Sequence, residues 1–119
     1  MVNFILVILA KVLYLVVEPI NFIYVILIKK KFTWKRLDGY FRNEALAIDR
    51  FGNSQYRSLF NTWFVKENGY KHGNINETIS SVLGKNQRDE TLTKLGKLLV
   101  KILDTIDKNH CKESINENV

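Results

Sequence analysis

The chain has 119 residues, a formal net charge of +6 and a single cysteine. This length allows one small hydrophobic core beside any membrane segment, and a single cysteine excludes an intramolecular disulfide. Five positive charges lie between residues 29 and 36, whereas residues 37–119 carry 12 basic and 11 acidic residues. A nucleic-acid-binding domain is expected to carry its positive charge on a folded face, so this distribution argues against nucleic acid as a partner.

The first predicted element is a helix within residues 1–31. Residues 2–28 are apolar almost throughout, with Lys11, Glu18 and Pro19 as interruptions. About 27 helical residues reach roughly 40 Å, which exceeds the roughly 30 Å of a bilayer's hydrocarbon core. No basic residue precedes the apolar run and no small-residue cleavage site follows it, so a retained membrane helix is favoured over a signal peptide.

The orientation of this helix follows from its flanks. Basic residues flank only its C-terminal end, which places the rest of the chain in the cytoplasm. Pro19 predicts a kink near residues 14–18, and this kink can also divide the segment into two pieces that lie flat in the interface. A transmembrane helix and an interfacial helix therefore both stay open.

Polar residues inside the helix fall on one face, in steps of three and four. A charge in hydrocarbon is costly, so such residues usually face protein or water. We interpret this stripe as a self-association surface; the alternatives are that the charged side chains extend to the interface or that the helix lies in the interface. The membrane stripe consists of Asn3, Lys11, Tyr14, Glu18 and Asn21.

Residues 32–43 are predicted to form a juxtamembrane linker. The basic residues here suit anionic lipid headgroups, and the aromatic residues suit the membrane interface. The candidate headgroup contacts are Lys29, Lys30, Lys31, Trp34, Lys35 and Arg36.

Residues 44–115 are predicted to form a small helical domain, followed by a frayed tail at 116–119. One helix ends at a turn at Gly52-Asn53, and a second carries an aromatic face through Phe64. Asn76 is the expected N-cap of a third helix, which Gly84 is expected to end. The fourth helix carries an apolar face from Leu92 to Ile106, with Asp89 or Thr91 as its cap. The fold class is all-α, with three or four helices after the N-terminal one.

Candidate catalytic groups are sparse, and no cofactor is predicted. His72, His110 and Cys111 are weak metal-ligand candidates, because none of them shows a short ligand spacing. Ser80 or Ser81 with Lys85 can be read as a Ser–Lys pair, although Ser81 and Lys85 also have the ordinary spacing of surface neighbours on a helix. The carboxylates Glu44, Asp49 and Glu77 have no fixed separation that would indicate glycoside cleavage.

Several segments are similar to small, membrane-anchored proteins of tailed bacteriophages and prophages. The likeness covers roughly residues 45–115, and its specific parts are Glu77-Thr78-Ile79-Ser80-Ser81 with Gly84-Lys85, and Asp107 with His110-Cys111-x-x-Ser114-Ile115. Asp49-x-x-Gly52-Asn53 belongs to the same pattern. The resemblance implies a phage origin and a bacterial host, and it transfers no activity. It also implies that the polar residues of the two specific segments meet. The residues of unknown role are Asn53, Glu77, Ser80, Ser81, Lys85, His110 and Cys111.

We therefore expect a phage-encoded, single-span protein of the bacterial inner membrane that acts by binding or oligomerisation. A lysis-related, holin-like or exclusion role fits this expectation, with a homo-oligomer or a host or phage membrane protein as partner. The alternative is a membrane-tethered, metal-dependent hydrolase that uses Glu77, His72, His110 and Cys111.

Overall fold

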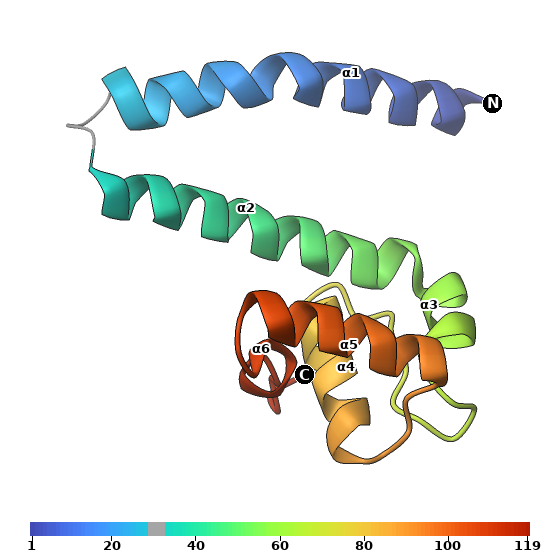
Figure 1. The fold of residues 1–119 in the computed structure, drawn as a ribbon. Helices are drawn as coiled ribbons and strands as arrows, with labels where there is room; N and C mark the ends of the chain where they lie inside the picture. Colours follow the sequence, from blue (N-terminus) through green and yellow to red (C-terminus); the bar gives the residue numbers. More distant parts are fainter. Residues whose placement is uncertain (29–32) are drawn as a thin grey trace. The chain divides into compact units, whose positions relative to one another are not determined.

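The computed structural model describes residues 1–28 and 33–119. The predicted headgroup contacts Lys29, Lys30 and Lys31 lie outside the described residues. The described residues form helices and no strand, which confirms the all-α prediction. In chain order the elements are α1 (Val2–Phe22), the π-helix η1 (Ile23–Ile28), α2 (Trp34–Gln55), α3 (Arg57–Trp63), α4 (Ile79–Arg88), α5 (Lys94–Ile106) and α6 (His110–Glu113), as Figure 1 shows.

The chain divides into two compact units. The N-terminal unit comprises Met1–Arg42 and the C-terminal unit comprises Asn43–Val119. Helix α2 begins in the first unit and ends in the second, so most of the predicted linker 32–43 is helical.

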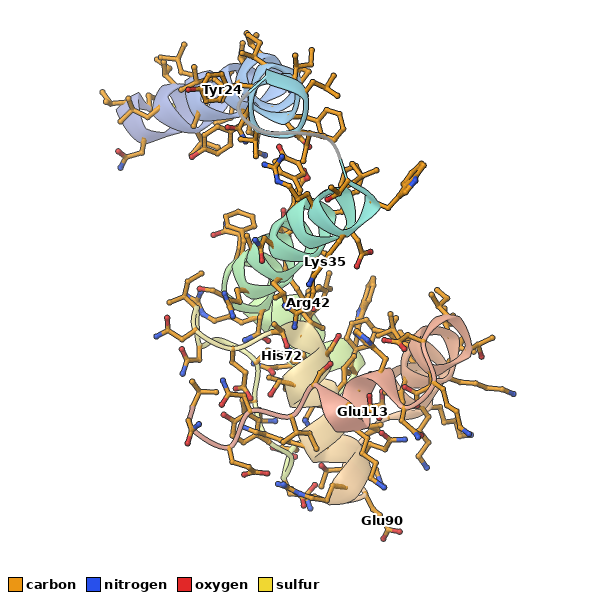
Figure 2. All side chains as sticks on the ribbon, turned by 90° about the vertical axis from the view of Figure 1, so that its left-hand side faces the viewer. Tyr24, Lys35, Arg42, His72, Glu90 and Glu113 are labelled. Carbon is orange, nitrogen blue, oxygen red and sulfur yellow. The ribbon has the colours of Figure 1, made fainter. Side chains whose placement is uncertain are left out.

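Helix α1 runs through Pro19 without a break. The division into two pieces is therefore not observed, and the irregular hydrogen bonding lies later, in η1. No side chain of α1 is buried, and the side chains stand out all round the helix (Figure 2). By length and composition, the stretch Val2–Leu27 is the one candidate membrane span among the described residues.

Helix α2 continues through Gly52 and Asn53, so the predicted turn there is wrong. Both residues are buried against other parts of the C-terminal unit. A Cβ on Gly52 would lie 3.1 Å from Cδ1 of Ile79, and the Asn53 side chain donates to the carbonyl of Asn74 at 2.9 Å. Glycine and asparagine usually mark a turn when they are adjacent. Here Gly52 allows close approach of Ile79 and Asn53 makes a tertiary hydrogen bond.

Helix α4 differs from its prediction at both ends. Its N-cap is Thr78, whose Oγ1 accepts from the Ser81 N–H, and not Asn76. Gly84 does not end the helix, which runs on to Arg88. A Cβ at Gly84 would lie 2.2 Å from the carbonyl oxygen of Cys111, so glycine lets α6 approach α4 closely.

Helix α5 begins after Thr93, whose Oγ1 accepts from the Gly96 N–H, and neither Asp89 nor Thr91 caps it. Leu92 precedes the helix and forms an isolated antiparallel bridge with Val65. Two backbone hydrogen bonds flank this bridge, from Lys66 N–H to Thr91 and from Thr93 N–H to Phe64.

The core of the C-terminal unit lies where α4, α5 and α6 contact one another (Figure 1). Its buried members come from all three helices and from the segment before α5. Phe64 at the end of α3, Ile79 of α4, and Leu99 and Leu103 of α5 are partly buried and pack against them. The fully or nearly buried core residues are Leu83, Leu92, Val100 and Cys111.

Candidate functional site

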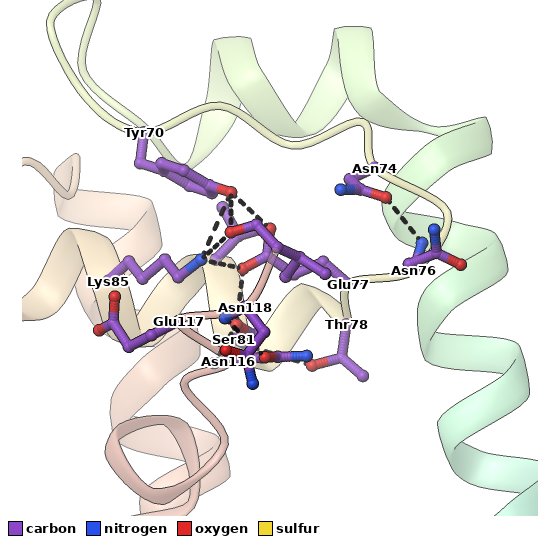
Figure 3. Close-up of polar contacts among 12 residues, drawn as sticks. Tyr70, Asn74, Asn76, Glu77, Thr78, Ser81, Lys85, Asn116, Glu117 and Asn118 are labelled. Carbon is purple, nitrogen blue, oxygen red and sulfur yellow. Dashed lines mark hydrogen bonds and ion pairs between the residues drawn. The ribbon is translucent and has the colours of Figure 1, made fainter.

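A buried ion pair occupies the start of α4. Lys85 Nζ lies 2.7 Å from Glu77 Oε2, and the two side chains are 4% and 0% exposed. Glu77 directly precedes the N-cap Thr78, and Lys85 lies inside α4. The extended backbone of Thr78 leaves Glu77 outside the helix, where its carboxylate reaches Ser81 and Lys85 of α4. Figure 3 shows how Tyr70, Ser81 and the C-terminal residues gather around this pair.

The Glu77 carboxylate is fully engaged. Its Oε1 accepts from the Tyr70 hydroxyl at 2.8 Å, and its Oε2 accepts from the Ser81 hydroxyl at 2.6 Å as well as from Lys85. Burial pulls the pKa of Lys85 down, but the hydrogen bonds to Glu77 and Tyr70 outweigh it and hold the pKa above its ordinary value. A lysine held in its charged form cannot take a proton from serine, so this arrangement does not form a Ser–Lys catalytic pair.

The C-terminal residues are part of the same network, although 116–119 were expected to fray. The Asn116 N–H donates to Ser81 Oγ at 2.9 Å, and Lys85 Nζ donates to the Val119 carbonyl at 3.1 Å. Arg88 also forms an ion pair with Glu117. These contacts satisfy polar groups of Ser81 and Lys85 that are buried in the C-terminal unit.

A second hydrogen-bonded chain joins α2, α4 and α6. Asp49 Oδ1 accepts from the Ile79 N–H at 2.5 Å, and Asp49 Oδ2 lies 3.3 Å from Ser80 Oγ. Ser80 Oγ lies 3.0 Å from His110 Nε2, and His110 Nδ1 lies 3.1 Å from Asp107 Oδ2. The segments 77–81 and 107–115 therefore meet at Ser80 and His110.

The order Ser80–His110–Asp107 repeats the connectivity of a hydrolase triad, but its surroundings oppose that chemistry. A tetrahedral intermediate needs N–H donors aimed at its oxyanion. The N–H groups of Ile79 and Ser81 instead bond to Asp49 and Thr78. The Asp49 carboxylate thus occupies the helix N-terminus, where it would repel a developing negative charge. Burial raises its pKa, which the hydrogen bonds from Ile79 and Ser80 partly offset.

His72 lies inside the C-terminal unit at 4% exposure (Figure 2). Asn53 gives its amide hydrogens to the Asn74 carbonyl, so its Oδ1 faces His72 Nδ1 at 2.7 Å and requires a proton there. His72 Nε2 is consequently an unprotonated, buried nitrogen with no hydrogen-bond partner among the described residues. Burial lowers the pKa of His72 to about 4.

The metal-ligand candidates do not form a set. His72 bonds to Asn53, whereas both ring nitrogens of His110 are taken by Ser80 and Asp107. Cys111 is fully buried, and burial raises the pKa of its thiol to about 12. Across residues 1–28 and 33–119, no group of three or more His, Cys, Asp or Glu side chains is placed to hold a metal ion.

Two network residues carried no sequence signal that we recognised. Asn86 is fully buried; its Oδ1 accepts from Tyr70 N–H at 2.9 Å and from Thr91 Oγ1 at 2.6 Å. Its Nδ2 donates to the Tyr70 carbonyl at 2.8 Å. An asparagine inside a helix is unfavourable by propensity, and that local conflict was the available indication that Asn86 and Tyr70 have tertiary roles.

In the N-terminal unit, α1 is continuous through the membrane stripe, so Asn3, Lys11, Tyr14 and Glu18 share one helix face. Asn21 has a partner outside α1, because its Nδ2 donates to the Tyr40 hydroxyl at 3.1 Å. Among the basic residues near the predicted interface, Arg36 donates to the Val25 carbonyl at 2.7 Å. Lys35 is exposed, and Trp34 begins α2.

Comparison with protein-family models, curated proteins and solved structures finds no match to this chain.

Proposed function

We propose that this chain is a phage-encoded, single-span protein of the bacterial inner membrane that acts by binding or oligomerisation. The observation that carries the proposal is the apolar helix α1, which has no buried residue. The stretch Val2–Leu27 has a mean hydropathy of 2.0 in its candidate window, and none of that window is buried. The core helix of a soluble domain buries its apolar face within that domain. Helix α1 does not, so its apolar side chains need an apolar environment outside the chain, and a bilayer supplies one.

The polar residues of the C-terminal unit favour binding over catalysis. Glu77, Lys85, Ser80 and His110 are each tied to partners within the chain, so none is presented to a substrate as a free acid, base or nucleophile. A metal-dependent hydrolase would need ligands that converge, and among the described residues no such group is found. The resemblance to phage proteins supports a lysis-related, holin-like or exclusion role, with the C-terminal unit in the cytoplasm.

The membrane stripe is the proposed contact between copies. Translocon scales put a central Lys or Asp at roughly +2.5 to +3.5 kcal/mol each, so Lys11 and Glu18 both need compensation. Two helical turns separate them by about 10 Å, which is too far for pairing within one helix. Neighbouring helices can provide the pairing if they are antiparallel or staggered.

Replacing Lys11 and Glu18 together by leucine is expected to leave insertion intact and to weaken self-association by about threefold to tenfold. Cross-linking of the full chain in bacterial membranes measures this effect. Val12→Leu with Val16→Leu, on the opposite face of α1, is the matched control and should cross-link like the parent. A double Lys11/Glu18 variant that cross-links as strongly as the parent would show that the stripe is not the contact. If the unmutated chain is monomeric in membranes, the proposed holin-like role is wrong.

A further inference from the structure

The C-terminal unit exposes an apolar surface that its own core does not use. Leu95, Leu98, Ile102 and Ile106 follow one another on α5 in steps of three and four, so they form one stripe along the helix. They are between 44% and 80% exposed. The buried side of α5 is elsewhere, at Gly96 and Val100. We call these four residues the α5 stripe.

An apolar hollow continues the α5 stripe toward the rest of the unit. Leu99 and Leu103, the next α5 residues round the helix, line a hollow of about 730 Å³ together with aromatic side chains of α2 and α3. Exposed apolar patches of this extent in a soluble domain usually mark a protein or membrane contact.

Lysines border the α5 stripe. Lys94, Lys97 and Lys101 each precede a stripe residue by one position, which places them about 100° round the helix from it. No ion pair among the described residues involves these three lysines. The acidic residue of α5, Asp104, is turned to α6, where it accepts from the Cys111 N–H at 3.2 Å.

We propose that the α5 stripe and its lysines dock the C-terminal unit on the surface of an anionic lipid bilayer. An apolar helix face bordered by lysines is the pattern of a helix that lies in the membrane interface, and lysines near the surface are attracted to anionic headgroups. A second copy of the chain is the less favourable occupant. In a two-fold symmetric contact the same patch meets itself, which would bring the lysines of both copies together.

The inference rests on the proposed function in one respect: the membrane anchor keeps the C-terminal unit at a bilayer. The docking adds a second lipid contact to that of the anchor. This contact is made by the C-terminal unit, although the net charge of residues 37–119 is close to zero. Docking would hold the buried polar networks of this unit at a fixed distance from the membrane.

Depth measurement on the full chain tests the docking. A fluorescent maleimide is attached to Ile102→Cys, or to the matched control Ile75→Cys in the loop before α4, where the isoleucine is likewise exposed. The native Cys111 is fully buried, so the introduced cysteine takes the label. Each labelled chain is reconstituted in vesicles of phosphatidylglycerol and phosphatidylcholine, or of phosphatidylcholine alone, and exposed to acyl-chain quenchers and to aqueous iodide.

We expect acyl-chain quenching of the label at 102, several-fold above the label at 75, in the anionic vesicles. Lys94→Gln with Lys101→Gln should weaken docking roughly twenty-five-fold, because each lysine near the surface is worth about fivefold in binding. Equal iodide quenching of the labels at 102 and 75 would overturn the proposal. Iodide protection at 102 that is lost when protein is diluted with lipid would assign the surface to a second copy instead. The same vesicles are also extracted with alkaline carbonate. Release of the protein by carbonate would show that the anchor fails, whereas quenching of the labels reports on docking alone.

Discussion

Lys85→Met is expected to destabilise the C-terminal unit by about 3–5 kcal/mol, because it leaves the Glu77 carboxylate buried without its counter-ion. The side chains of both partners are nearly inaccessible to water. The Tyr70 and Ser81 hydroxyls would still donate to Glu77, but neither supplies a charge. Urea unfolding of the full chain in detergent micelles, followed through Trp63 in a Trp34→Phe background, measures the loss.

Two further variants separate the ion pair from general disturbance. Lys112→Met, on the exposed surface of α6, should change the free energy of unfolding by less than about 0.5 kcal/mol. Glu77→Gln combined with Lys85→Met should be more stable than Lys85→Met alone, since no unpaired charge remains. If Lys85→Met costs no more than Lys112→Met, the pair is not buried in the folded protein.

The stability of the C-terminal unit is expected to fall as the pH drops through the range between 6.5 and 4. The pKa of His72 is lowered from 6.5 to about 4 by burial. Above pH 6.5 the ring is neutral in both states and costs nothing. Below that value His72 binds a proton in the unfolded chain but stays neutral in the folded chain. The free energy of unfolding therefore falls by about 2 kcal/mol at pH 5 and by about 3 kcal/mol below pH 4.

The variant His72→Gln isolates this contribution from other titrating groups. Glutamine can still donate to Asn53 Oδ1, but it takes up no proton. The difference in unfolding free energy between parent and variant should therefore depend on pH in this window, with the parent losing stability toward pH 5. A difference that stays constant between pH 7.5 and pH 5 would contradict a buried, neutral His72.

The elements that sequence reasoning predicted well are those set by long periodic patterns. The apolar run of α1 and the repeating leucines of α5 need no tertiary information, because burial or a bilayer selects them directly. The ends of helices were less predictable. At Gly52, Asn53 and Gly84 the residues that usually mark turns instead allow close packing or bond across the core.

The polar sites were predicted unevenly for a similar reason. The segments of Ser80 and His110 were expected to meet, and Ser80 Oγ lies 3.0 Å from His110 Nε2. The Glu77–Lys85 pair joins residues eight apart, a helical spacing of two turns, but its burial depends on Tyr70 and the C-terminal residues. Tyr70 comes from a loop and the other partners come from the end of the chain, so no local sequence pattern predicts these contacts.

We propose that α1 and η1 cross the bilayer and thereby hold the chain in the membrane. Extraction of bacterial membranes with alkaline carbonate tests it most directly, with the full chain expressed and detected in pellet and supernatant. Because the apolar stretch Val2–Leu27 is long enough to cross the hydrocarbon core, we expect the chain to stay in the pellet, as an integral protein does. Release of the chain into the supernatant would contradict a span and leave an interfacial helix.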